Sequence, residues 1–208
     1  MSAALAGLVA ATAMVLAACG GSGSPTAAPS AHATTPVAGH SGASKQSPVP
    51  AESNPPGDIP DTTVFVPYQS EAPRAMIKVP EGWARQTSVS GTTFSSNLNS
   101  ITIAAVPMAA VPTVASARGT TVPSLSRSSL AFQLQSVGAV QLPGGPAVEV
   151  VYEVNSQPNA VTGRQYRLVI ERFELYRNGQ GAVLSLSSAV GSDNVDPWRT
   201  VSDSFQWE

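Results

Sequence analysis

Three alternating segments near the C-terminal end of this 208-residue chain restrict its fold more than any other feature. Residues 147–154 place an apolar side chain at every second position, with glutamates between them, as a half-buried strand requires. Residues 165–177 read as a second strand, and Asn178-Gly179 is a favoured hairpin turn into a third strand at 181–190. The three segments predict an antiparallel meander with one face toward a core.

Two further strand signals precede the meander. Residues 75–79 read as a strand that stops at Pro80–Trp83, where proline removes a ladder donor and glycine permits a tight turn. We expect Trp83 to fold back onto the sheet. Residues 91–95 and 101–106 predict a hairpin around an Asn-Leu-Asn turn.

A helical period appears between these strand regions. Ser124 is a candidate N-cap for a helix that runs to about Val137 with a partly apolar face. The connection before this helix is long and is interrupted by Pro107, Pro112 and Pro123.

A second helical period closes the chain. Asp196 is a candidate N-cap, with Pro197 at the first helical position. One helical stripe is apolar, so a short terminal helix should dock on the sheet. The stripe consists of Val195, Trp198, Val201 and Phe205.

These elements all lie between Asp58 and Glu208, which is enough chain for one core. Strands followed and interrupted by helices predict the α+β class. We therefore expect a single domain at 58–208, built on an antiparallel β-sheet of about six or seven strands flanked by helices.

The N-terminus carries an export signal. Residues 1–18 are apolar and uncharged, and they end in Leu16-Ala17-Ala18-Cys19-Gly20, which is a lipobox. A lipoprotein signal peptidase needs small residues before its cut, and the new N-terminal Cys19 offers a thiol for diacylglyceryl transfer. We expect residues 1–18 to be removed and Cys19 to carry acyl chains such as palmitate, which anchor firmly in a membrane.

Two observations bear on this signal. The alternative, a transmembrane or buried helix at 1–18, requires a segment that is barely long enough to span a bilayer. No basic residue precedes the apolar run, because Lys45 is the first one in the chain, which leaves the true start codon open.

A tether follows the lipobox. Residues 20–57 are almost entirely Gly, Ser, Ala, Pro and Thr, without an aromatic residue or a hydrophobic period, so we expect 19–57 to be a disordered tether. A flexible coil of about 38 residues spans on the order of 35 Å. Both histidines, His32 and His40, fall in this tether, where no fixed partner could orient them for catalysis or metal binding.

The composition excludes several functions. Only 12% of residues are charged and the net charge is −2, so nucleic acid is not an expected partner. The single cysteine excludes an intrachain disulfide. Residues 58–208 contain no His and no Cys, which removes Ser-His, Cys-His and His-metal machinery. We expect no catalytic, metal-binding or cofactor-binding residue.

Carboxylates are the remaining candidate catalytic groups. Glu149 and Glu153 share a strand face about 13 Å apart, too far for a glycosidase pair by themselves. We expect exposed cross-strand ion pairs with Arg167 or Arg172 instead.

The other candidate groups are interpreted as structural residues. Glu171 and Glu174 read as solvated strand residues. Asp58 and Asp61 flank a proline in a turn, where carboxylates favour local backbone hydrogen bonds over calcium. Gly144-Gly145 precedes a strand and not a helix, so it is not a phosphate loop.

A family resemblance rests on the strand-Pro-x-Gly-Trp element at Met76–Trp83 and on the closing Trp198 and Phe205-Gln206-Trp207. Together with the helix and meander between them, these motifs resemble the PsbP-like superfamily, including actinobacterial lipoproteins of the LpqN type, over Asp58–Trp207. The resemblance implies an antiparallel sheet flanked by helices. That superfamily hosts a photosystem subunit, a Ran-binding import factor and envelope lipoproteins, so it implies a binding scaffold without fixing a function.

Three functions therefore compete. The favoured one is a non-enzymatic binding or accessory module for a protein or envelope component, lipid-anchored on the extracytoplasmic face of the cell membrane. The second is a carrier of a lipid or other apolar ligand in a cavity between sheet and helices, with Met108–Val122 as the candidate mouth; the plain reading of that stretch is a surface loop. The third is a carboxylate-only hydrolase, which needs carboxylates from separate strands to converge.

Overall fold

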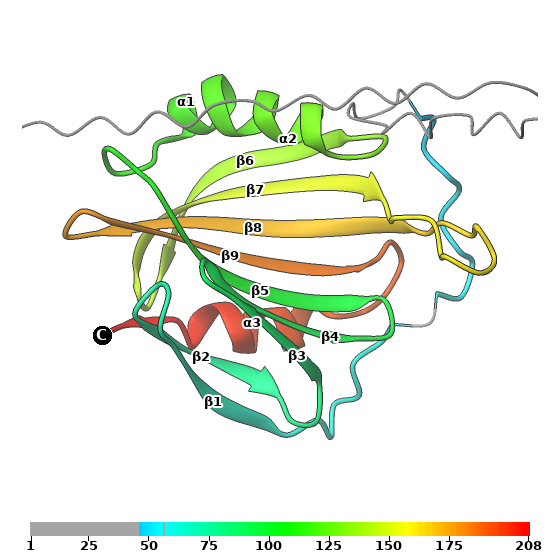
Figure 1. Cartoon of the computed structure of the whole chain (residues 1–208), viewed down its shortest axis with the longest axis horizontal. Coiled ribbons are helices and arrows are strands. Elements are labelled where there is room, and N and C mark those ends of the chain that lie inside the picture. The colour runs from blue at the N-terminus through cyan, green and yellow to red at the C-terminus, as the bar shows by residue number, and fades with distance from the viewer. Residues whose placement is uncertain (1–45, 56) are drawn as a thin grey trace, which may run out of the picture. The chain divides into compact units, whose positions relative to one another are not determined.

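A seven-stranded antiparallel sheet, in the order β3-β4-β5-β9-β8-β7-β6, dominates the computed structural model, which describes residues 46–55 and 57–208 (Figure 1). The predicted antiparallel α+β class is confirmed by this sheet and its helices. The strands are β3 (Ala84–Ser88), β4 (Gly91–Ser96), β5 (Asn99–Val106), β6 (Gln133–Leu142), β7 (Gly145–Asn155), β8 (Arg167–Arg177) and β9 (Gln180–Ala189).

A second, smaller sheet was not expected from the sequence. It has the order β1-β2-β10 and lies below the large sheet in Figure 1. Its central strand is the predicted one at 75–79. Trp83 was expected to fold back onto the sheet, but its ring packs edge-to-face on Trp198 of the C-terminal helix, with ring centroids 6.4 Å apart. The strands are β1 (Phe65–Ser70), β2 (Ala75–Pro80) and β10 (Gln206–Trp207).

The predicted turns are confirmed. Asn178 and Gly179, between β8 and β9, have φ angles of 50° and 82°, so both adopt the left-handed region that the favoured two-residue hairpin turn requires. Asn97, between β4 and β5, has a φ of 52°. The meander β7-β8-β9 and the β4-β5 hairpin therefore form where local sequence placed them.

Each face of the large sheet packs against a different partner. One face and the small sheet enclose the main core together with α3 (Val195–Asp203), and Phe205 is fully buried there. The other face packs against a helical segment at 114–128 through Val148, Val150 and Tyr152. The side chains of β7 therefore point alternately to the face of the main core and to this second core, called here the helix-side core.

The helical segment is displaced from its predicted position. It consists of α1 (Val114–Ser116), one π-helical turn (Ala117–Thr121) and α2 (Val122–Ser128), whereas we expected a helix from Ser124 to Val137. Its N-cap is Thr113, which forms a capping box with Ser116.

The second half of the expected helix is a strand instead. Ser129 is extended and Ala131 has a φ of 49°, which reverses the chain into β6. Nine residues of β6 then pair with β7. This pairing outweighs the weak helical period of the segment, because tertiary context overrides local propensity.

The terminal helix α3 forms as predicted, with two corrections. Its N-cap is Asn194 and not Asp196, and the Asn194 side chain accepts the Ile59 N–H at 2.8 Å instead of capping the helix. Of the predicted stripe, Trp198 and Val201 are buried, but Val195 is 62% exposed and does not dock. Phe205 is fully buried but lies beyond the helix, which ends at Asp203.

The described part of the expected tether lies against the domain. The Asn155 side chain accepts from the Val49 N–H at 3.0 Å and donates to the Ser47 carbonyl at 2.9 Å, and Glu52 pairs with Arg164. Contact with the domain therefore begins before residue 58. Within 46–55 and 57–208, no helix has the length and apolar character needed to cross a membrane.

Candidate functional site

The segment between β5 and α2 borders two open pockets on the helix-covered face of the large sheet. The larger, of about 560 Å³, is called here the Arg172 pocket. One wall is the mainly apolar stretch 106–112. The other wall carries hydroxyl groups of the helical segment, among them Thr120 and Thr121, and β8 contributes Arg172 and Glu174.

An ion pair stands in this pocket. Arg172 Nε lies 3.1 Å from Glu174 Oε1, and the side chains are 20% and 7% exposed. Thr121 donates its hydroxyl to the Glu174 carboxylate, with distances of 3.0 and 3.2 Å to the two oxygens. Within the described residues, the terminal guanidinium nitrogens of Arg172 make no hydrogen bond.

The alternation of β8 explains why two charged residues reach this face. Leu168 and Ile170 pack into the helix-side core, so Arg172 and Glu174 follow on the same side at the same period. This pair was not among the sites expected from the sequence. The alternation of side chains along the strand could have revealed it, because this alternation places Arg172 and Glu174 on the same face as Leu168.

Burial and charge also act on the neighbouring Tyr152. Desolvation raises the pKa of its phenol, and the positive charge of Arg172 partly offsets that rise. The guanidinium charge is therefore felt inside the helix-side core.

This arrangement is suited to binding. A guanidinium with unused donors next to an apolar wall can hold a carboxylate or carbonyl group while apolar parts of the same ligand contact the wall.

The second pocket, of about 480 Å³, is called here the Val114 pocket. It lies between the start of α1 and the strands β6 and β7, and its apolar lining includes Val114, Ala139 and Val148. Val111 and Pro112 line both pockets, so the two adjoin. The predicted mouth at 108–122 thus borders both pockets, but it is helical from Val114 onward and not a surface loop.

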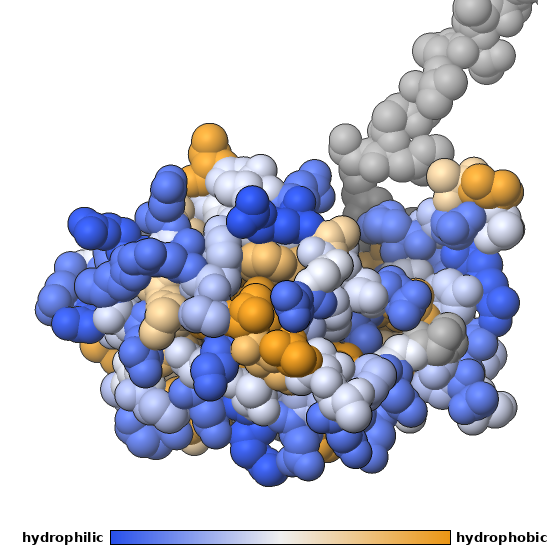
Figure 2. Space-filling model, turned by 90° about the horizontal axis from the view of Figure 1, so that it is seen from below, coloured by the Kyte–Doolittle hydropathy of each residue, from blue (hydrophilic) through white to orange (hydrophobic). Residues whose placement is uncertain are grey.

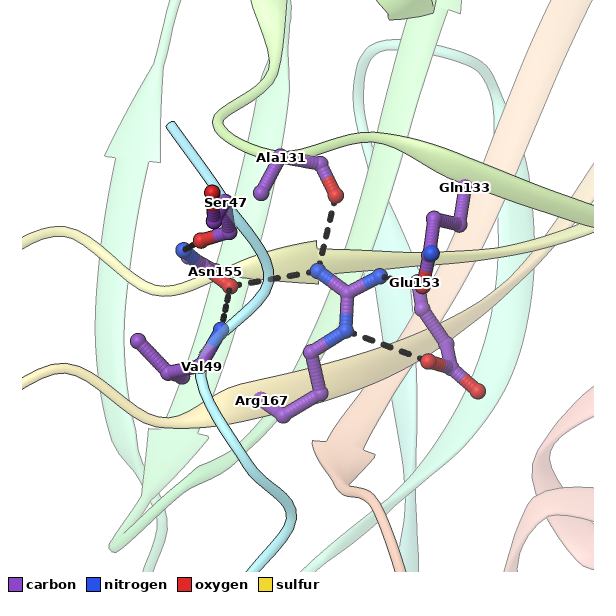
Figure 3. Close-up of polar contacts among 7 residues, drawn as sticks. All are labelled: Ser47, Val49, Ala131, Gln133, Glu153, Asn155 and Arg167. Atoms are coloured by element: carbon purple, nitrogen blue, oxygen red, sulfur yellow. Dashed lines mark hydrogen bonds and ion pairs between the residues drawn. The ribbon is translucent and has the colours of Figure 1, made fainter. Parts of the chain in front are cut away.

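The predicted exposed ion pair at Glu153 is in fact buried on its arginine side. Arg167 Nε lies 3.1 Å from Glu153 Oε2, and the Arg167 side chain is only 3% exposed (Figure 3). Three further hydrogen bonds join its guanidinium to Ala131 O, Asn155 Oδ1 and Gln133 Oε1. This arginine has its donors occupied and acts as a structural tie.

The remaining glutamates divide between two environments. Glu174 was expected to be solvated, but it is buried beside Arg172. Glu149 and Glu171 are half-buried on the opposite face of the sheet from the Arg172 pocket. Burial raises the pKa of both carboxyls, and the negative charge of Glu149 raises that of Glu171 further.

Other predicted residues have structural roles. The Asp58 carboxylate accepts the Asp193 N–H at 2.9 Å, and Asp61 is exposed. A Cβ on Gly144 would lie 2.6 Å from the carbonyl oxygen of Phe205, so close packing requires this glycine. In the part of the chain that the structure describes, no three His, Cys, Asp or Glu residues converge as metal ligands.

Three predicted residues lie outside the described range. Cys19, His32 and His40 all precede residue 46, as does the expected signal peptide 1–18. The lipidation of Cys19 stays a prediction.

No protein-family model and no curated protein matches the sequence. Among solved structures, the chain is similar to the cyanobacterial PsbP of Synechocystis sp. PCC 6803, with 15% identity and a TM-score of 0.49 over 73% of this chain and 98% of that one. It is also similar to a protein of unknown function from Pseudomonas aeruginosa, with 15% identity and a TM-score of 0.41 over 65% and 91% of the two chains. Likeness of this degree assigns neither a family nor a function, and the LpqN-type resemblance stays a prediction.

Proposed function

We propose that this protein is an exported lipoprotein, anchored through Cys19 on the extracytoplasmic face of a membrane, whose domain is a non-enzymatic binding module. Its partner is a protein or envelope component that docks in the Arg172 pocket. The anchor is supported by the lipobox at 16–20 and by the Gly/Ser/Ala/Pro/Thr composition that follows it.

The Arg172 pocket is the observation that carries the binding role. Arg172 is held in place by Glu174, which Thr121 also contacts, so the guanidinium is positioned before a partner arrives. Its terminal nitrogens are the donors left for that partner. We therefore expect the partner to present a carboxylate or carbonyl acceptor beside an apolar group.

A carrier of an apolar ligand is the second candidate, and the apolar lining of the Val114 pocket favours it. Both pockets open to solvent, which suits a docked segment of a protein better than an enclosed lipid. The two candidates differ in the chemistry of what occupies the pockets.

The test is photo-crosslinking in the native envelope. A benzophenone amino acid at Val111, which lines both pockets and is 54% exposed, should yield one discrete crosslinked species. The same label at the fully exposed Val89, outside both pockets, is the matched control. Thr120 lines the Arg172 pocket and makes no hydrogen bond to Arg172 or Glu174, so Thr120→Trp should fill the pocket and abolish the crosslink.

Each outcome of this test has a meaning. A crosslinked protein that is lost with Thr120→Trp and binds again after purification supports the proposed partner. A crosslinked lipid replaces it with the carrier. Labelling at Val111 that equals labelling at Val89 refutes the binding site.

The anchor has a separate test. Replacing Cys19 by Ala should abolish incorporation of an alkyne-tagged palmitate and leave the unprocessed length. Acylation that persists in the Cys19→Ala variant would overturn the anchor and leave the binding site untouched.

A further inference from the structure

The Arg172 pocket carries no net charge. Of the described residues that line it, Arg172 and Glu174 are the only charged ones, and they form the ion pair at 3.1 Å. Arg172 and Thr121 both donate to the Glu174 carboxylate, as suits an ionised carboxyl group. The positive charge that a ligand meets in this pocket is therefore already balanced by the protein.

This balance decides which kind of acceptor the pocket can hold. Arg172 is 20% exposed, so an acceptor loses much of its hydration when it reaches the terminal guanidinium nitrogens. Removing a carboxylate from water costs far more free energy than removing an uncharged carbonyl. An arginine that is paired with Glu174 offsets only part of that cost, because Glu174 also repels the negative charge of the ligand. The pocket therefore favours an uncharged carbonyl.

The hydroxyl groups of the pocket extend the match from a carbonyl to a whole peptide group. Thr120 and Ser124 line the helical wall about one turn apart, and a hydroxyl can both donate and accept. A peptide group offers its carbonyl to Arg172 and its N–H to such a hydroxyl. A fatty-acid carboxylate and a lipid ester have no N–H to offer.

We infer that the Arg172 pocket binds an internal peptide group within an apolar segment of the partner protein, and that it discriminates against a chain-terminal carboxylate or a fatty acid. This inference rests on the proposed function, because it names the chemistry of the partner that docks at the same site. The adjoining Val114 pocket then receives an apolar side chain next to that peptide group, since Val111 and Pro112 line both pockets. Glu174 is the specificity-determining residue, because its charge excludes anions.

A matched pair of small probes tests this preference. One probe is a short diazirine-bearing fatty acid, and the other is its N-methylamide, which replaces the carboxylate by a peptide-like group on the same alkyl chain. Each probe is irradiated at neutral pH with the full chain in detergent solution, and the labelling of residues 106–128 is located by mass spectrometry. The methylamide should label these residues about tenfold more than the acid, because like charges brought together in a site are strongly unfavourable.

Glu174→Gln is the decisive variant, since glutamine keeps the shape of the side chain and an oxygen for Arg172 Nε but removes the charge. Labelling by the acid should then rise about tenfold, while labelling by the methylamide changes little. Glu149→Gln is the matched control: it removes the same charge from β7 on the opposite face of the sheet and should leave the ratio of the two probes as in the wild type. The underside of the domain shows mainly hydrophilic residues with small groups of hydrophobic ones between them (Figure 2), so both probes should label it weakly and equally.

The outcomes separate this inference from the proposed function. Acid that labels residues 106–128 of the wild type as strongly as the methylamide overturns the inference. So does a probe ratio that stays unchanged in Glu174→Gln while tryptophan fluorescence shows a folded domain; if this variant does not fold, the wild-type ratio decides alone. Labelling by neither probe above that of the underside also overturns it, whereas a discrete envelope crosslink at Val111 would still support a binding site there.

Discussion

The Arg167 cluster allows a quantitative prediction about what holds the domain together. In Arg167→Met, a side chain of similar length replaces a guanidinium that is 3% exposed and makes four hydrogen bonds. Removing one partner of a buried ion pair costs about 3–5 kcal/mol, because the other partner loses its compensation. Glu153 is 23% exposed and can rehydrate in part, so we expect the lower end, about 3 kcal/mol.

The measurement is unfolding of the full chain in urea, followed by tryptophan fluorescence. Trp83 and Trp198 contact each other edge-to-face in the main core, so their emission reports on its loss. In a thermal scan of the same variant, a loss of about 3 kcal/mol corresponds, for a domain of this size, to a fall in Tm of roughly 6–12 °C.

The control is Arg164→Met, which removes an arginine whose side chain is 55% exposed and whose ion pair is with Glu52. An exposed ion pair contributes little, so this variant should unfold with the wild type. If Arg167→Met also unfolded with the wild type, the cluster would not stabilise the domain and the reasoning from its burial would be wrong.

Two further predictions concern Glu171 and Gly144. Burial, and then the charge of Glu149, raise the pKa of Glu171 in the folded state above its value in the unfolded state. The protonated carboxyl therefore stabilises the fold below the unfolded-state pKa, and this stability is lost as the pH rises through the folded-state pKa. Glu171→Gln should therefore be more stable than the wild type at pH 7 and match it near pH 4 in urea unfolding; a gain that is equal at both pH values would contradict this. Gly144→Ala should lower the free energy of unfolding by about 1–3 kcal/mol, because its Cβ would meet Phe205 at 2.6 Å. Gly138→Ala, whose Cβ would meet nothing within 4 Å, should leave it nearly unchanged, and equal losses in the two variants would refute the packing argument.

Local signals were enough to predict the meander and its turn. The alternation in β7 and β8 and the Asn178-Gly179 dipeptide each act within a few residues, so no distant contact is needed to read them. The same holds for α3, although its N-cap was misplaced. The side chain of the true N-cap, Asn194, accepts a hydrogen bond from the Ile59 N–H, 135 positions away, and does not cap the helix.

Segments that depend on distant partners were predicted poorly. Residues 133–137 have a weak helical period, and only the presence of β7 beside them makes them the start of β6. The strands β1 and β3 were missed, since their short sequences carry little alternation of their own.

The candidate site shows the same division. Strand parity in the sequence determined that Arg172 and Glu174 share a face with Leu168, and that Arg167 lies on the other face. It did not determine what covers each face, because alternation gives direction and carries no information about the opposing layer. Only the tertiary structure, by folding 106–128 over β8, decided that the Arg172–Glu174 pair borders a pocket while Arg167 is enclosed as a structural tie.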